Sequence, residues 1–371
     1  MRAFELRGDG VLLAAPTRDN VDIITELCQD EDVQRWTTVP SPYTRDDGEK
    51  FLSDVVEPGW ESGRDLTWAV RDQEDRSILG MIGMHQRDPG SAEVGFWMGA
   101  PSRGRGLMTT AVRLVCEYAL DPDGGGMERI VWRAVPGNWG SRRLAWRLGF
   151  TFDGTIRRDL LQRGVRRDCW IGTLLAGEPM EPKSRWLDVP TLPGPTVTLR
   201  RFTETDADAV VEACTDPVTR HWLGAELPDP YTHESALNFI QRCEHQHAIG
   251  SGLFWTGERP DGGPALGSFS LMPIKDGQAE VGYWVHPDAR GSGVATEAVR
   301  LMKQHAFGAE SDGGLGLRRL VLAHAEGNDA SRIVAGRAGF THWGTASKAE
   351  LLGDGSWVDL HWYELLNPLA D

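Results

Sequence analysis

The chain has 371 residues, of which 40% are hydrophobic and 25% are charged. That length suits two domains of ordinary size better than one. The formal net charge of −15 argues against a nucleic-acid partner, because a phosphate backbone requires a basic protein face. No run approaches the roughly 20 apolar residues of a membrane span, so we expect no membrane partner either.

The cysteine pattern and the N-terminal segment indicate in which cellular compartment the protein works. The N-terminal segment lacks the apolar core of an export signal. The five cysteines are odd in number and scattered, and they never form a Cys-x-x-Cys pair. This pattern indicates neither a disulfide framework nor a metal site and is typical of a reducing compartment. We therefore expect a cytoplasmic protein with no bound metal.

The two halves of the chain predict the same order of elements. Each begins with a short strand and a helix whose start carries Asp19-Asn20 or Thr205-Asp206 as cap candidates. A second helix, three strands, a glycine-rich turn leading into a helix, and a further strand follow. In the first half these segments are expected at 11–14, 46–55, 66–70, 78–86, 93–98, 103–119 and 129–134. In the second half they are expected at 197–200, 234–245, 252–258, 265–273, 280–286, 290–307 and 319–325. A helix near Ser141 or Ser331 and a terminal hairpin close each half.

The halves also repeat each other in sequence. The segment Ala-Glu-Val-Gly-Phe-Trp at 92–97 returns as Ala-Glu-Val-Gly-Tyr-Trp at 279–284. The glycine turns are offset by 290 − 103 = 187 residues, far beyond the roughly 20–50 residues of a stacked repeat. Between the halves, prolines recur too often for a helix or a central strand. We therefore predict two duplicated domains, 1–176 and 196–371, joined by a Pro-rich linker at 177–195.

Each glycine turn follows a strand and opens directly into a helix. The turns read Arg-Gly-Arg-Gly at 103–106 and Arg-Gly-Ser-Gly at 290–293. A helix N-terminus presents unpaired N–H groups and a favourable dipole to an anion. Glycines allow the backbone to approach closely and to adopt positive φ angles. The pattern predicts a site for a phosphate-bearing cofactor in each half.

On these motifs the chain resembles the GNAT N-acetyltransferase superfamily, in its RimJ/RimL-like branch and in tandem duplication. The superfamily's turn is Gln/Arg-x-x-Gly-x-Gly/Ala, which residues 290–295 satisfy fully. Residues 103–108 satisfy it except that Met108 replaces a small residue. An Asn-x-x-Ser segment followed by Gly-Phe, at 138–150 and 328–340, completes the likeness.

The resemblance implies a fold and a cofactor. The fold is α/β (mixed α+β), with two domains that are each a twisted mixed sheet of about six to seven strands flanked by helices. The cofactor is acetyl-CoA, with its pyrophosphate on the turn and its pantetheine arm paired beside the preceding strand. In the first half we expect it to contact Trp97, Met98, Arg103, Gly104, Arg105, Gly106, Leu107, Met108, Thr109 and Asn138. In the second half we expect it to contact Trp284, Val285, Arg290, Gly291, Ser292, Gly293, Val294, Ala295, Thr296 and Asn328.

Two of these side chains raise specific expectations. Arg103 and Arg290 would add positive charge beside the phosphates. Met108 would either crowd the cofactor or point away from it, since only its backbone N–H is needed. We expect Met108 to point away and the first domain to keep its cofactor.

Acetyl transfer to an amine requires a neutral amine, a positioned thioester, an oxyanion donor and a proton for the departing thiolate. The superfamily often uses a strand glutamate as the base, which corresponds to Glu93 and Glu280. A strand-end glutamate paired with a neighbour would explain the same residues.

The proton donor is less clear from the sequence. The tyrosine that many members use is missing, since the matching positions are Ala145 and Ala335. The RimJ/RimL-like branch suggests Ser141 and Ser331 instead. Helix capping would produce the same Asn-x-x-Ser pattern.

The resemblance places the acceptor pocket between the first two helices and the terminal hairpin. The candidate walls are the aromatic residues Trp36, Tyr43, Trp222 and Tyr231. Packing in the core is the alternative for the two tryptophans.

These observations favour an acetyl-CoA-dependent N-acetyltransferase that acts on a primary amine, either a protein N-terminus or a small molecule such as an antibiotic. Direct attack is favoured because no cysteine with a base partner lies beside the motifs. Two alternatives stay open: a non-catalytic acyl-CoA-binding or regulatory protein on the same scaffold, and one active domain with a structural partner. Whether the chain forms a homodimer also stays open.

Overall fold

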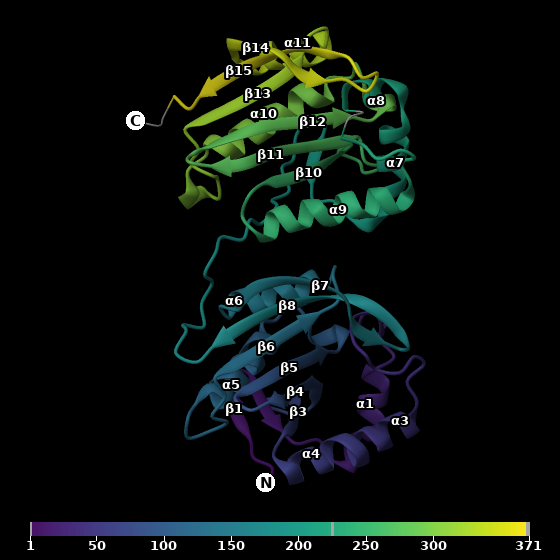
Figure 1. Cartoon of the computed structure of the whole chain (residues 1–371), viewed down its shortest axis with the longest axis vertical. Coiled ribbons are helices and arrows are strands. Elements are labelled where there is room, and N and C mark those ends of the chain that lie inside the picture. The colour runs from purple at the N-terminus through teal and green to yellow at the C-terminus, as the bar shows by residue number, and fades with distance from the viewer. Residues whose placement is uncertain (1, 224–225, 369–371) are drawn as a thin grey trace. The chain divides into compact units, whose positions relative to one another are not determined.

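The computed structural model describes residues 2–223 and 226–368 and contains two compact units (Figure 1). The units are Met1–Lys183 and Ser184–Asp371. The division falls inside the segment that the sequence predicts as a linker. Each unit carries one mixed sheet with helices packed against it, which confirms the predicted fold class.

The first unit is built on an eight-stranded sheet of order β1-β2-β3-β4-β5-β6-β8-β7. All neighbours are antiparallel except β5 and β6, which are parallel. The strands are β1 (Leu6–Gly8), β2 (Val11–Ala14), β3 (Asp65–Asp72), β4 (Ile78–Asp88), β5 (Ser91–Met98), β6 (Arg129–Ala134), β7 (Thr151–Gln162) and β8 (Val165–Leu175). The sequence did not predict β1, which has only three residues and lacks an apolar run.

The helices of the first unit are α1 (Val21–Leu27), α2 (Glu31–Trp36), α3 (Arg45–Lys50), α4 (Glu57–Ser62), α5 (Leu107–Leu120) and α6 (Trp139–Arg147). A π-helical segment, Phe51–Val56, joins α3 to α4, so the helix predicted at 46–55 is longer than expected. Asn20, one of the predicted cap candidates, is the N-cap residue of α1, although its side chain accepts from the N–H of Thr17 and not from α1.

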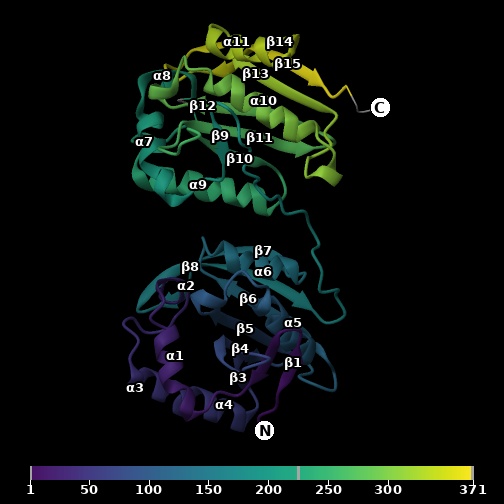
Figure 2. The same ribbon diagram turned by 180° about the vertical axis from the view of Figure 1, so that it is seen from behind.

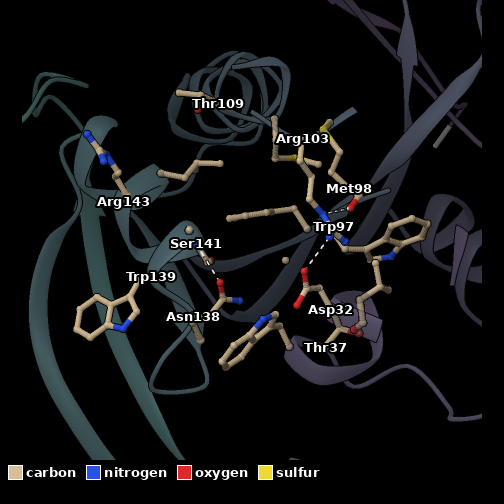
Figure 3. A pocket seen from close by; sticks show the side chains of 18 of the residues that line it. Asp32, Thr37, Trp97, Met98, Arg103, Thr109, Asn138, Trp139, Ser141 and Arg143 are labelled. Carbon is tan, nitrogen blue, oxygen red and sulfur yellow. Dashed lines mark hydrogen bonds and ion pairs between the residues drawn. The ribbon is translucent and has the colours of Figure 1, made fainter. Parts of the chain in front are cut away.

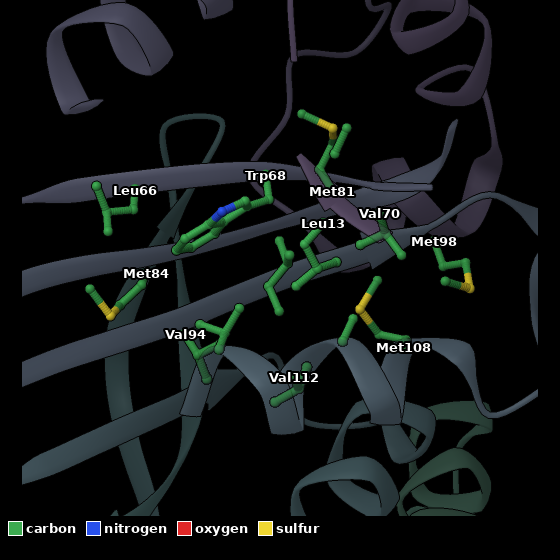
Figure 4. Close-up of a cluster of buried hydrophobic side chains, with 14 of the residues drawn as sticks. Leu13, Leu66, Trp68, Val70, Met81, Met84, Val94, Met98, Met108 and Val112 are labelled. Carbon is green, nitrogen blue, oxygen red and sulfur yellow. The ribbon is translucent and has the colours of Figure 1, made fainter. Parts of the chain in front are cut away.

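Helix α5 supplies much of the core of the first unit. Its buried residues recur three or four positions apart, at Met108, Ala111, Val112, Val115 and Cys116, which places them on one face. This face packs against β2, β4, β5 and β6. Figure 4 shows Met108 and Val112 pointing into a cluster of apolar side chains from these strands. The packing fixes the start of α5 beside the end of β5.

The second unit repeats this plan on a seven-stranded sheet of order β14-β15-β13-β12-β11-β10-β9. The strands are β9 (Thr198–Arg200), β10 (Leu253–Glu258), β11 (Gly267–Lys275), β12 (Gln278–Val285), β13 (Arg319–Ala325), β14 (Thr341–Leu351) and β15 (Trp357–Leu366). The helices are α7 (Ala207–Thr215), α8 (Pro217–Leu223), α9 (His233–Ala248), α10 (Val294–Phe307) and α11 (Asp329–Ala338). Figure 2 shows α10 crossing this sheet, where it contacts β9, β11 and β12. Only β12 and β13 are parallel.

In each unit the two parallel strands separate part-way along their length. The pairing of β5 with β6 ends at Val94 opposite Trp132, although β5 continues to Met98. The pairing of β12 with β13 ends at Glu280 opposite Val321, although β12 continues to Val285. The ends of β5 and β12 therefore expose a backbone edge, and each leads into the glycine turn.

Part of the predicted linker packs on the second unit. Leu187 is only 4% exposed, and its N–H donates to the carbonyl of His247 over 2.9 Å. The indole N–H of Trp255 donates to the carbonyl of Pro190 over 2.8 Å. Leu192 forms an isolated β-bridge with Leu199 of β9. Residues 187–192 therefore belong to the second unit.

No helix within residues 2–223 and 226–368 has the length and apolar character needed to cross a bilayer.

The fragment 196–371 is expected to be less stable than the fragment 184–371. Its free energy of unfolding should be lower by about 2–4 kcal/mol, because it loses the burial of Leu187 and the hydrogen bond from Trp255 to Pro190. Urea denaturation followed by tryptophan fluorescence measures the difference. In the longer fragment, Leu187→Ala should account for more than half of the loss. Equal stability of the two fragments would show that the packing of 187–192 contributes nothing.

Candidate functional site

The glycine turns leave backbone N–H groups unpaired at the start of a helix. Gly106 precedes α5 with a φ of +79°, and Gly293 precedes α10 with a φ of +85°. Neither helix has a side-chain cap hydrogen bond in the described part of the chain. The first N–H groups of an uncapped helix require an anion, water or another acceptor.

The space in front of each turn is open. A Cβ built on Gly104, Gly106, Gly291 or Gly293 would meet no atom within 4 Å. The glycines are therefore not required by crowding within the protein. They provide positive φ angles, and they leave room at the position where a diphosphate would sit. The residues present fit such a group.

In the first unit a cavity of about 590 Å³ lies in front of the turn. Its wall combines the free end of β5, the turn and start of α5, the start of α6, and part of α2 (Figure 3). It brings together the predicted cofactor residues Trp97, Met98, Arg103, Gly104, Gly106, Leu107, Met108, Thr109 and Asn138. Ser141 and Trp36 also line it. Arg105 lies outside the lining and is 3.8 Å from a carboxylate oxygen of Asp72.

The guanidinium groups of the two turn arginines are paired with aspartates of their own domains. The guanidinium of Arg103 pairs with Asp30, with Asp32 over 2.9 Å, and with the carbonyl of Met98. The guanidinium of Arg290 pairs with Asp216 over 2.5 Å. That these arginines add positive charge beside the phosphates stays a prediction.

These ion pairs tie the turn to the preceding helical corner. Asp30 accepts from the N–H of Val33 at the start of α2, and Asp216 accepts from the N–H of Thr219 in α8. Each aspartate therefore caps a short helix and holds the turn arginine at the same time. Arg290 also donates to the hydroxyl of Thr219 over 2.8 Å. The ion pairs of the two arginines therefore link the glycine turn to α2 in the first unit and to α8 in the second.

Met108 does not obstruct the turn. Its side chain is 7% exposed and packs in the core between α5 and the sheet (Figure 4). In the second unit the first residue of α10, Val294, is buried in the same manner, and Ala295 packs beside it. The backbone N–H groups remain at the turn in both units.

The Asn-x-x-Ser segments are helix starts in both units. The side-chain oxygen of Asn138 accepts from the N–H of Ser141 over 3.1 Å, and Asn328 accepts from Ser331 over the same distance. Asn138 and Ser141 both line the cavity of the first unit (Figure 3). The capping interpretation of this pattern is therefore correct, and it also directs the serine towards the cavity.

Each of these serines has an aromatic partner that the sequence analysis missed. Ser141 Oγ accepts from the indole Nε1 of Trp132 over 2.9 Å. Ser331 Oγ lies 2.8 Å from the phenolic oxygen of Tyr283. The only sequence signal was the change from Phe96 to Tyr283 within an otherwise repeated segment.

The two strand glutamates lie in opposite electrostatic environments. Glu93 is 3.1 Å from Arg87 and 3.6 Å from Arg133. Glu280 has no ion pair in the described part of the chain. Burial raises the pKa of Glu280, and the nearby carboxylates of Glu226 and Glu350 raise it further. A buried carboxylate without an ion pair binds a proton more readily than one in water.

The candidate acceptor walls divide into two groups. Trp36 lines the cavity, and Trp222 lies 3.8 Å from the position of a Cβ on Gly327, in the loop before α11. Tyr43 and Tyr231 are 7% and 6% exposed and belong to hydrophobic cores. The prediction that the two tyrosines form walls of the acceptor pocket is therefore corrected, because their rings pack in these cores.

In the second unit the remaining predicted residues occupy the corresponding positions. Trp284 and Val285 lie on β12 beyond its pairing with β13. The hydroxyl of Ser292 donates to the carbonyl of Ala289 over 2.6 Å, which closes the turn. Thr296 lies in the first turn of α10.

The acetyltransferase (GNAT) domain family matches the chain twice, over residues 11–151 and 196–341. The chain belongs to the GNAT acetyltransferase family. The two matched regions lie in separate compact units, so the protein is a tandem of two GNAT domains, as the sequence predicted. Acetyl-CoA is the cosubstrate of this family.

YoaA of Bacillus subtilis (strain 168), an uncharacterised N-acetyltransferase, is 28% identical over 183 residues, which cover 48% of this chain and 98% of YoaA. YdaF of the same strain, named provisionally as a ribosomal N-acetyltransferase, is 33% identical over 106 residues. That match covers 28% of this chain and 57% of YdaF, so the chain spans just over half the length of that relative.

Among solved structures, RimL, a ribosomal L7/L12 α-N-protein acetyltransferase in complex with coenzyme A, is 17% identical. The match covers 46% of this chain and 98% of RimL, with a TM-score of 0.42.

The substitution Gly293→Glu is expected to abolish acetyl-CoA binding by the second domain. The new side chain would be strained at a positive φ and would place a negative charge where the diphosphate binds. Isothermal titration calorimetry should show the loss of one binding event. The control is Gly336→Glu, at an exposed helical glycine whose Cβ would also meet open space. Unchanged affinity in Gly293→Glu would refute the assignment of this turn.

Proposed function

We propose that the chain is an acetyl-CoA-dependent N-acetyltransferase that acetylates a primary amine by direct attack, with the second domain carrying most of the turnover. The observation that carries this proposal is the contrast between the two strand glutamates. Glu280 sits at the point where β12 and β13 separate, without a cationic partner in the described residues. Glu93 sits at the corresponding point and is held by two arginines.

In this mechanism Glu280 prepares the amine. An amine arrives as an ammonium ion, which must lose a proton before its nitrogen can attack the thioester carbon. Glu280 accepts that proton, directly or through one water. Its raised pKa lies closer to the pH of the working solution than the pKa of an ordinary glutamate does. A pKa near the working pH suits a general base. The new C–N bond then forms as the C–S bond breaks.

The remaining residues bind and position the cosubstrate. The free edge of β12, from Val281 to Val285, supplies backbone groups that can pair with the pantetheine arm. The turn at 291–293 and the first N–H groups of α10 receive the diphosphate. The ion pair between Arg290 and Asp216 holds α8 beside that turn. Helix α8 would form part of the acceptor pocket.

The acceptor is an amine that binds beside negatively charged side chains. Glu226 and Glu350 lie near Glu280, and the chain as a whole carries a net charge of −15. Such a field attracts cationic amines. Protein N-termini are the first class to test, because YdaF and RimL carry names that refer to ribosomal proteins. Small-molecule amines such as aminoglycoside-like antibiotics and polyamines are the second class.

A thiol-release assay with the full chain tests the proposal across N-terminal peptides and small amines. Turnover with at least one amine is expected, and Gly293→Glu should remove most of it while Gly106→Glu leaves most of it. Tight acetyl-CoA binding without turnover over the whole panel would favour a regulatory acyl-CoA-binding protein. Greater loss from Gly106→Glu would assign the activity to the first domain.

The acid side of the pH profile tests Glu280 separately. Because burial and neighbouring carboxylates raise the pKa of Glu280, its base form is lost as pH falls through a value above the ordinary 4.5. The kcat/KM of the second domain should therefore decline on the acid side around that raised value. Glu280→Gln should lower kcat/KM by about a hundredfold or more and flatten this decline.

The matched variant is Glu350→Gln, which removes one of the carboxylates that raise the pKa of Glu280. It should shift the acid limb to lower pH and leave the rate at high pH largely intact. An acid limb that is identical in the parent and in Glu280→Gln would exclude Glu280 as the base.

A further inference from the structure

In each domain the serine near the start of the helix α6 or α11 is hydrogen-bonded to an aromatic side chain, but the aromatic residue differs. In the first domain, the serine at the start of α6 receives a hydrogen bond from Trp132 on β6. In the second domain, the serine at the start of α11 is paired with Tyr283 on β12. The donors therefore come from different strands, although the serines occupy the same place in the fold.

The strand registers show that the two aromatic positions are exchanged. Glu93 lies opposite Val131, and Glu280 lies opposite Val321. The counterpart of Trp132 is therefore Leu322, and by the repeated segment the counterpart of Tyr283 is Phe96. Each domain thus has one polar aromatic group against its serine and an apolar side chain at the other position.

We propose that Trp132 and Tyr283 are positioning residues that orient the hydroxyls of Ser141 and Ser331, so that each serine offers its own hydrogen to the sulfur of the cosubstrate. This inference rests on the proposed function and identifies how that site assists the leaving group.

The first domain shows the physical reason most directly. An indole N–H can donate but has no lone pair to accept. Ser141 Oγ must therefore be the acceptor in its bond with Trp132, and its own hydrogen must point elsewhere. The backbone N–H of Ser141 is already tied to Asn138, and the residue lines the cavity. The proposal directs the hydroxyl hydrogen into this cavity, towards the sulfur of the cosubstrate.

The second domain reaches the same result with a phenol. A phenol is more acidic than an alkyl alcohol and is therefore the better donor of the pair, so Tyr283 donates to Ser331 and leaves the serine hydrogen available. Burial raises the pKa of Tyr283 to about 12, so the phenol keeps its proton at neutral pH. Tyr283 also packs against the core of its domain, which limits its movement.

The chemical step balances without full proton transfer from serine. As the amine nitrogen bonds to the carbonyl carbon, the C–S electron pair stays on sulfur. The serine O–H donates a hydrogen bond to the thiolate and stabilises it. The sulfur then takes up a proton from solvent, and the proton lost by nitrogen leaves through the base. The serine ends the step unchanged.

The test uses the full chain carrying Gly106→Glu, so that only the second domain binds acetyl-CoA. Tyr283→Phe should lower kcat about three- to tenfold, the effect of one hydrogen bond, with the KM for acetyl-CoA unchanged. The loss should be absent in a Ser331→Ala background, because the phenol acts only through the serine. Tyr363→Phe, which removes a hydroxyl bonded to His324 rather than to serine, is the matched control.

A second readout needs no turnover. The pKa of the thiol of bound CoA, measured from the ultraviolet absorbance of the thiolate, should rise in both Tyr283→Phe and Ser331→Ala and stay unchanged in Tyr363→Phe. An unchanged thiol pKa in Tyr283→Phe, or a loss of kcat that persists in the Ser331→Ala background, would overturn the inference. Absence of turnover with every amine would instead count against the proposed function, and the thiol titration would still decide this proposal.

Discussion

The unpaired N–H groups at the start of α5 and α10 are the constraint on which the site depends. Each helix begins directly after a glycine in the left-handed region, without a side-chain cap in the described chain. Those donors need an acceptor, and the space before them is open. The separation of the parallel strands provides a second open backbone edge beside the first. A cosubstrate with a diphosphate and an amide-rich arm matches both features at once.

Around this shared frame the two domains have diverged in their polar groups. In both domains an ion pair joins the arginine of the glycine turn to an aspartate, so the turn is attached to the neighbouring helix in the same way. The strand glutamate is paired with two arginines in the first domain and lies near two carboxylates in the second. The division of labour that we propose follows from this difference, because the environment of a carboxylate decides whether it can accept a proton.

Much of the fold was predictable because backbone information is local. The alternating strand before each turn, the glycines, and the three-to-four spacing on α5 each determine their own segment. Two kinds of feature were not predictable. Strand β1 has three residues, too few for a pattern. Whether Tyr43 faces a pocket or a core, and whether Arg103 meets a phosphate or Asp30, depends on residues far away in the chain. The partners Trp132 and Tyr283 were missed for the same reason.

The most direct measurement is the change in backbone amide NMR resonances when acetyl-CoA is added to the full chain. We predict that two molecules bind, with the largest downfield shifts at residues 104–109 and 291–296, where N–H groups meet the diphosphate. Large shifts that spare both turns and appear elsewhere in the chain would contradict it.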